Sequence, residues 1–129
     1  MTELRNSELS GRVIEAAIAV HTAVGPGFLE SVYENALCIE LRRRGIELEQ
    51  QTPVVVGDKG ERVGERRLNL LVAGLLLVEL KACKAIEAIF LAVARAQMRA
   101  IRIQDGIILS FAAMPLLIKR VGPGPISDS

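Results

Sequence analysis

The sequence predicts an α/β domain in which helices flank a mixed β-sheet. Three observations favour this class: two apolar stripes at helical spacing near the N-terminus, strand-like segments separated by turn signals from residue 46 to residue 82, and a further helix followed by short apolar strands. With 129 residues, half of them hydrophobic, the chain has the size and core of one domain. We expect a single domain over residues 1–129, with a flexible tail at residues 122–129.

Two helices are predicted before residue 46. The first has apolar residues at helical spacing from Leu9 to His21, and the Gly-Pro-Gly turn of residues 25–27 ends it. The second runs from about Leu29 to Arg44, because its last turn is basic and Gly45 can close it.

Three strands are predicted next. They cover Ile46–Val56, Glu61–Val72 and Leu75–Ala82, with turn signals at Gly57–Gly60 and between the second and third strands. Pro53 favours an edge position for the first strand, because proline cannot donate to the ladder. The apolar run of the third strand indicates burial on both faces.

A third helix is predicted at Ala85–Ile103, followed by a buried strand at Gly106–Ala112 and an edge strand at Pro115–Val121. The helix would then connect two parallel strands of one sheet, which is the usual role of a crossover helix.

Composition excludes several functions. Sixteen Lys and Arg residues balance fifteen Asp and Glu residues, so net charge argues neither for nor against a nucleic-acid partner. The longest uncharged apolar stretch, Leu70 to Val78, is shorter than the ~20 residues that cross a bilayer, so we expect no membrane partner. Cys38 and Cys83 lack a metal-binding spacing and are interpreted as reduced core thiols of a cytoplasmic protein.

The third predicted strand ends in two charges. Glu79 and Lys81 are two residues apart and therefore lie on one face of the strand. They are either a solvated rim or, alternatively, a cation ligand with a charge-stabilising lysine beside it. Asn69 lies in the preceding strand, and the hairpin can bring it close to Glu79, where its amide offers an oxygen without a negative charge.

The segment "GPGFLESVY" contains Gly27-x-x-Glu30-x-x-Tyr33, and "RLNLLVAGLLLVELKA" and "GIILSF" follow in order. In this set of motifs, from about Val13 to Val121, the chain resembles the GxxExxY proteins, which are placed in the PD-(D/E)XK nuclease-like superfamily. The resemblance implies a restriction-endonuclease-like mixed central sheet flanked by helices.

The resemblance also implies a catalytic site. Glu30, Glu79 and Lys81 match the catalytic residues of the family, and Glu30, Asn69 and Glu79 match its metal-binding positions. The implied activity is Mg²⁺-dependent hydrolysis of phosphodiester bonds in nucleic acid, in which metal and lysine activate a water.

Four positions depart from the family pattern. Asn69 stands where related proteins carry the metal-binding Asp, and this loss of charge predicts a weakened Mg²⁺ site. Phe90 and Val93 replace a histidine and a glutamine, while Gln97 falls on a family tyrosine and can face the same side one turn later. The alternative is therefore a catalytically impaired module that binds nucleic acid or assembles with proteins.

Nucleic-acid contacts are predicted for Tyr33, Arg67 and Gln97. Three of the predicted site residues have a structural alternative: Tyr33 can pack in the core, Arg67 can belong to a solvated charged face, and Glu30 can simply complement the positive start of its helix. The apolar strands and third helix also leave room for a homodimer.

Overall fold

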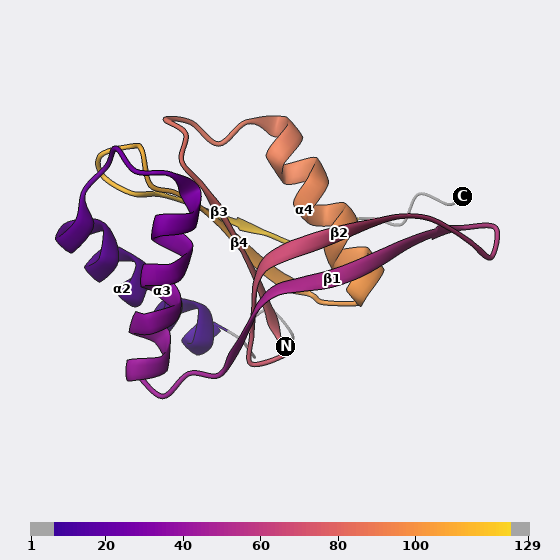
Figure 1. Cartoon of the computed structure of the whole chain (residues 1–129), viewed down its shortest axis with the longest axis horizontal. Coiled ribbons are helices and arrows are strands. Elements are labelled where there is room, and N and C mark those ends of the chain that lie inside the picture. The colour runs from indigo at the N-terminus through magenta and orange to yellow at the C-terminus, as the bar shows by residue number, and fades with distance from the viewer. Residues whose placement is uncertain (1–6, 125–129) are drawn as a thin grey trace.

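The computed structural model describes residues 7–124, and within that range three helices flank a five-stranded sheet (Figure 1). The elements are α2 (Ser7–Val24), α3 (Glu30–Arg43), β1 (Leu48–Asp58), β2 (Glu61–Val72), β3 (Leu76–Lys81), α4 (Ala88–Ile101), β4 (Asp105–Ser110) and β5 (Leu117–Val121). The strand order is β1-β2-β3-β4-β5, with β3 and β4 parallel and the other neighbours antiparallel. The predicted mixed α/β class is confirmed, and the arrangement is consistent with a restriction-endonuclease-like fold.

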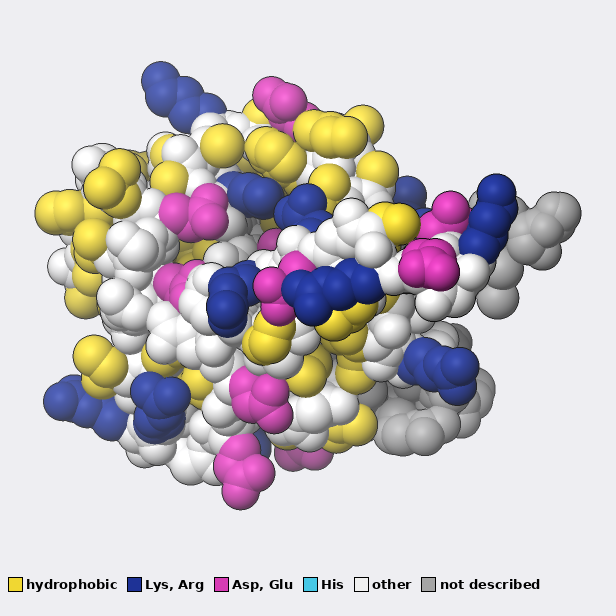
Figure 2. Space-filling view, turned by 45° about the vertical axis from the view of Figure 1, so that its right-hand side comes forward, with side chains coloured by type: hydrophobic (Ala, Val, Ile, Leu, Met, Phe, Trp, Pro, Cys, Tyr) yellow, Lys and Arg dark blue, Asp and Glu magenta, His cyan; other side chains and the backbone are white. Residues whose placement is uncertain are grey.

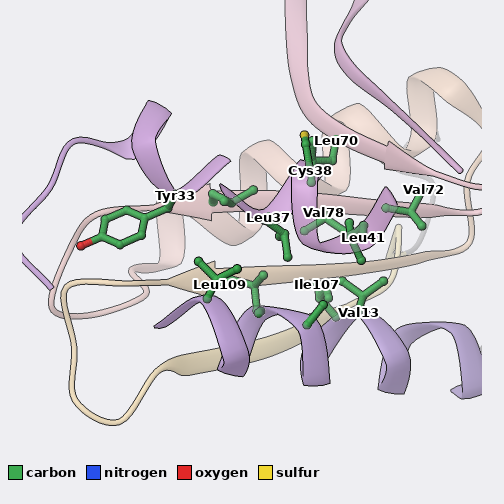
Figure 3. Packing of buried hydrophobic residues seen from close by; sticks show 14 of the residues in the cluster. Val13, Tyr33, Leu37, Cys38, Leu41, Leu70, Val72, Val78, Ile107 and Leu109 are labelled. Carbon is green, nitrogen blue, oxygen red and sulfur yellow. The ribbon is translucent and has the colours of Figure 1, made fainter. Parts of the chain in front are cut away.

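Helices α2 and α3 cover one face of the sheet. Val13 of α2 and Leu37 of α3 pack with Val78 of β3 and Ile107 of β4 in one buried apolar cluster (Figure 3). These residues recur at helical spacing in the helices and at alternate positions in the strands, so each element presents one apolar side to the cluster.

Helix α4 covers the opposite face. Its buried residues Ala94 and Met98 pack against Leu77 of β3 and Ile108 of β4 in a second cluster. Strand β3 is therefore buried on both faces, as its continuous apolar run predicts.

The hairpin of β1 and β2 extends beyond the rest of the sheet (Figure 1). β2 pairs with β1 along most of its length but with β3 only over Leu70–Val72. We call residues 53–67 the arm; most of its side chains are exposed, because no third strand or helix covers both of its faces. Pro53 lies in the edge strand β1, as predicted.

Some predictions differ from the structure. Cys38 is buried, but Cys83 is exposed, because it lies in the connection after β3 rather than in a packed element. The predicted core position of Cys83 is therefore wrong. No helix within residues 7–124 is long and apolar enough to cross a membrane. Residues 125–129 of the predicted tail lie outside the described residues.

Shortening a buried side chain of β3 should show how much the stability of the fold depends on its central strand. Leu80→Ala is expected to lower the free energy of unfolding by about 2–5 kcal/mol, because Leu80 is fully buried and the variant leaves a cavity. Urea denaturation measures this change. Leu75→Ala is the matched control, since Leu75 is 47% exposed and the same truncation there should cost less than about 1 kcal/mol. Equal losses in the two variants would contradict the assigned packing.

Candidate active site

The sheet divides where β2 separates from β3. Leu70 pairs with Val78, but the next residues, Asn69 and Glu79, are not paired through their backbones. Instead the backbone N–H of Asn69 donates to Oε2 of Glu79 at 3.1 Å, and the N–H of Leu80 donates to Oδ1 of Asn69 at 2.9 Å. We call Asn69, Glu79 and Leu80 the fork, because two side chains here replace the regular ladder between the strands.

Glu79 is a buried carboxyl group. Its side chain points to the same side of β3 as Leu77, toward α4, and the residue is only 6% exposed. Burial raises the pKa of Glu79 to about 7, although the Asn69 N–H and the charge of Lys81 both favour the ionised form. Glu30 adds to the rise and Arg66 opposes it. At neutral pH this carboxyl group is therefore protonated in a substantial fraction of the molecules.

Glu30 reaches the same place from α3. It lies in the first turn of that helix and is half-buried. Burial raises the pKa of Glu30; Lys81 acts against this rise, Glu34 adds to it, and the Asn69 side chain acts against it. The charges of Glu30 and Lys81 therefore both act on Glu79, so these three sequence-predicted residues lie close enough to interact electrostatically, although Glu30 comes from α3 and the other two from β3.

Lys81 is held over an aromatic ring. Its Nζ lies 4.6 Å from the centroid of the Phe90 ring, near the start of α4. This cation–π contact keeps the ammonium group beside the fork without forming a tight ion pair with either glutamate. The phenylalanine that departs from the family pattern thus positions the lysine of the predicted site.

Glu34 joins the cluster, and it was not predicted as a site residue. Its Oε1 accepts a hydrogen bond from Nδ2 of Asn69 at 2.7 Å, and the side-chain amides of Gln50 and Gln51 also donate to its carboxylate. Glu34 follows Glu30 by four residues and so lies on the same side of α3. This spacing is the signal in the sequence that could have identified it.

The geometry of the fork limits which side chains can bind a cation. Within residues 7–124, no three Asp, Glu, His or Cys side chains are arranged to hold a metal ion. Asn69 uses its side-chain oxygen to accept from Leu80, and the Glu34 carboxylate is occupied by amides. Glu30 and Glu79 remain, and two carboxylates are enough for a weakly held Mg²⁺ that keeps most of its waters.

Tyr33 is fully buried, which corrects its predicted role as a nucleic-acid contact. Its ring stacks on Phe111 at 4.6 Å between centroids, and it lies at one end of the apolar cluster in Figure 3. Its hydroxyl donates to the carbonyl of Gly25 at 2.6 Å and accepts from the N–H of Phe28 at 3.2 Å. The packing alternative therefore describes Tyr33, which joins α3 to the loop before it.

The other two predicted nucleic-acid contacts differ in burial: Gln97 is buried and Arg67 is exposed. Gln97 is 3% exposed, so it presents no surface to a nucleic acid, and neither atom of its side-chain amide has a hydrogen-bond partner among the described residues. It is buried because it lies on the side of α4 that faces the sheet, one position before Met98. Arg67 is exposed on β2, and its Nη1 donates to the Gln51 carbonyl at 3.0 Å.

Charges of both signs lie on the surface that carries the arm. On the face shown in Figure 2, Lys and Arg side chains alternate with Asp and Glu side chains, and hydrophobic side chains gather above them. Alternation of this kind produces no extended positive field of the sort that attracts a nucleic-acid backbone over long distances. Recognition of a substrate would then depend on short-range contacts at the site.

The raised pKa of Glu79 predicts a loss of stability with rising pH. An unfolded glutamate ionises near 4.5 and Glu79 ionises near 7, so between these values the unfolded chain loses its proton first. The free energy of unfolding should therefore decrease from pH 5 to pH 8, with Glu79 contributing about 2.5 kcal/mol. Urea unfolding at both pH values measures the decrease.

Glu79→Gln should remove most of that decrease, because a glutamine at this position cannot ionise. Glu61→Gln at the tip of the exposed arm is the matched control and should leave the decrease in place. A Glu79→Gln protein that loses as much stability as the unmodified protein would show that another group causes the pH dependence.

Loss of the Tyr33 hydroxyl should destabilise the protein. Tyr33→Phe leaves the Gly25 carbonyl and the Phe28 N–H without their partner while the ring stays stacked, at an expected cost of about 1–3 kcal/mol. Thermal or urea unfolding provides the measurement. Phe28→Leu, which keeps the Phe28 backbone contact and changes an exposed side chain, should cost less. If Tyr33→Phe is as stable as the unmodified protein, the hydroxyl has no anchoring role.

Comparison with known proteins assigns the family. A search of curated proteins and a search of solved structures each found no match. A family model described as the PD-(D/E)XK nuclease superfamily matches residues 7–121, a range that begins at α2 and ends with β5 and includes the whole fork. Because this match covers most of the chain, it establishes that the chain belongs to the PD-(D/E)XK nuclease superfamily.

Proposed function

We propose that this protein is a nuclease-like protein of the GxxExxY type that hydrolyses phosphodiester bonds in nucleic acid with the help of a weakly bound Mg²⁺. The observation that supports it most strongly is the electrostatic interaction among Glu30, Glu79 and Lys81 beside the fork, where one acid comes from α3 and the other two groups from β3. The superfamily match makes nucleic acid the expected partner.

Each residue has a role in this proposal. Glu30 and Glu79 supply the carboxylate oxygens that would hold the cation, and their raised pKa values mean that it binds best when both are ionised. When bound, Mg²⁺ supplies positive charge to a phosphate oxygen and lowers the pKa of a water. Lys81, fixed by the Phe90 ring, stabilises negative charge that develops on the phosphate and orients a water beside it.

Asn69 makes the proposed site weak for two separate reasons. Its amide has no negative charge, and its oxygen already accepts a hydrogen bond from Leu80. A cation at the fork would thus find two carboxylates rather than three. The expected result is low affinity for the metal and slow cleavage, rather than an absence of the fold that supports them.

The second candidate function is a module that binds nucleic acid or assembles with other proteins but does not cut. The same occupied oxygen of Asn69 favours it, and so does the absence of a three-ligand metal cluster from residues 7–124. A homodimer and a cytoplasmic location stay predictions under both functions.

Restoring the acid at position 69 distinguishes the two functions. Asn69→Asp is expected to bind Mn²⁺ and Mg²⁺ at least about tenfold more tightly than the unmodified protein, because it adds one full charge to the site. Calorimetry measures the affinity. Cleavage of plasmid and single-stranded DNA in Mg²⁺ should increase in parallel, and the gain should be larger at pH 8 than at pH 6, where Glu79 carries its proton more often.

Two variants serve as controls for this experiment. Asn69→Asp combined with Glu79→Gln should lose the gained affinity, because it again leaves two carboxylates. Asn69→Asp combined with Lys81→Ala should keep the affinity and lose cleavage. A protein with Asn69→Asp that gains neither affinity nor cleavage would favour the non-cutting module, and unchanged cleavage without Lys81 would remove that residue's proposed role.

A further inference from the structure

Glu34 carries more hydrogen bonds than any other described carboxylate near the fork. It is 5% exposed, and its Oε1 accepts from Asn69 at 2.7 Å and from Gln51 at 3.0 Å. Its Oε2 accepts from Gln50 at 2.8 Å and from Gln51 at 2.9 Å. A buried carboxylate is costly unless its oxygens are satisfied, and here three neutral amides satisfy them without a cation.

The backbone of β1 is bent to allow this arrangement. Gln51 has a φ of 59°, in the left-handed region that non-glycine residues rarely adopt. Gln51 and Asn69 are also absent from the ladder, which continues on either side with the pairs Gln50–Leu70 and Thr52–Leu68. Both residues that leave the ladder direct their side-chain amides to Glu34, so the irregularity of the two strands is centred on this carboxylate.

Glu34 determines which way the Asn69 amide faces. With Nδ2 donating to Glu34, Oδ1 faces the N–H of Leu80, and both contacts are satisfied. The reversed amide would place its oxygen against the carboxylate and its NH₂ against another donor, so both contacts would be repulsive. A neighbour that accepts hydrogen bonds is therefore required for the fork in its observed form.

We propose that Glu34 is a positioning residue of the candidate active site: its carboxylate fixes the Asn69 amide, and Asn69 in turn holds β2 and Glu79 of β3 together at the fork. This deepens the proposed function, since Glu79 is one of the residues assigned to it. The link itself concerns only the geometry of the metal-free protein. It can be tested without a metal ion or a substrate, so its failure and that of the nuclease proposal can be told apart.

Two substitutions distinguish the effect of the length of the Glu34 side chain from the effect of its charge. Glu34→Asp keeps the charge but shortens the side chain, so the carboxylate no longer reaches Asn69. Glu34→Gln removes the charge but keeps an oxygen at the same distance, and the flanking Gln50 and Gln51 can reverse their amides to match it. If Glu34 acts by positioning, Glu34→Gln should resemble the unmodified protein and Glu34→Asp should not.

Amide hydrogen exchange followed by ¹H–¹⁵N NMR measures the result at the fork. In Glu34→Asp, the N–H groups of Leu80 and Asn69 should exchange at least about tenfold faster, as expected when a hydrogen bond is lost and the local structure opens. The N–H of Leu109, in the central part of the sheet where β4 pairs on both sides, reports global unfolding and should change much less. In Glu34→Gln, all three exchange rates should stay within about threefold of the unmodified protein.

Glu40→Asp is the matched control, because it shortens a glutamate on the same helix that pairs instead with Arg44. It should leave the exchange of Leu80 unchanged. The proposal is overturned if Glu34→Gln opens the fork and Glu34→Asp does not, if neither opens it, or if Glu40→Asp opens it equally. Should Glu34→Asp fail to fold, Glu34→Gln decides: unchanged exchange at Leu80 supports positioning, and a tenfold increase excludes it.

Discussion

The early separation of β2 from β3 is the constraint on which the candidate site depends. Helix α3 and the Glu79 side chain belong to opposite faces of the sheet, and a continuous sheet would keep them apart. Because β2 pairs with β3 only as far as Leu70, the sheet is open beyond that residue. Through the opening Glu30 interacts electrostatically with Glu79, and Glu34 accepts a hydrogen bond from Asn69. The fork is therefore both an interruption of the ladder and the place where the two layers meet.

That opening exposes backbone groups that a sheet would otherwise pair, and the chain satisfies them with side chains. Glu79 accepts from the backbone of Asn69, and Asn69 accepts from the backbone of Leu80. Glu79 and Asn69 thus each satisfy a backbone N–H group in addition to the chemical role proposed for them. Replacing these residues will affect stability and activity together, so the two effects must be measured separately.

Sequence periodicity could predict the elements and part of the site. Alternation along β3 places Glu79 and Lys81 on one side, and the short hairpin brings Asn69 to them. Only the resemblance to a family predicted that Glu30 belongs to the site, because no local pattern relates the start of α3 to the end of β3. The role of Glu34 and the burial of Tyr33 and Gln97 depend on where β2 leaves the sheet and how the helices pack. Tertiary contacts determine these features, and periodicity does not report them.

The asparagine at position 69 has opposite consequences for cation binding and for stability without a cation. An aspartate there would place a carboxylate oxygen near the Glu34 oxygen that now accepts from Nδ2 at 2.7 Å, with Glu30 and Glu79 close by. Such a group of acids requires protons or a divalent cation to offset its repulsion. With an amide at position 69, the contact with Glu34 is a hydrogen bond instead of a repulsion. The strands are therefore held together without a cation, and the site binds a cation less strongly. The substitution that weakens the proposed chemistry is thus the same one that lets the fork hold together without a metal.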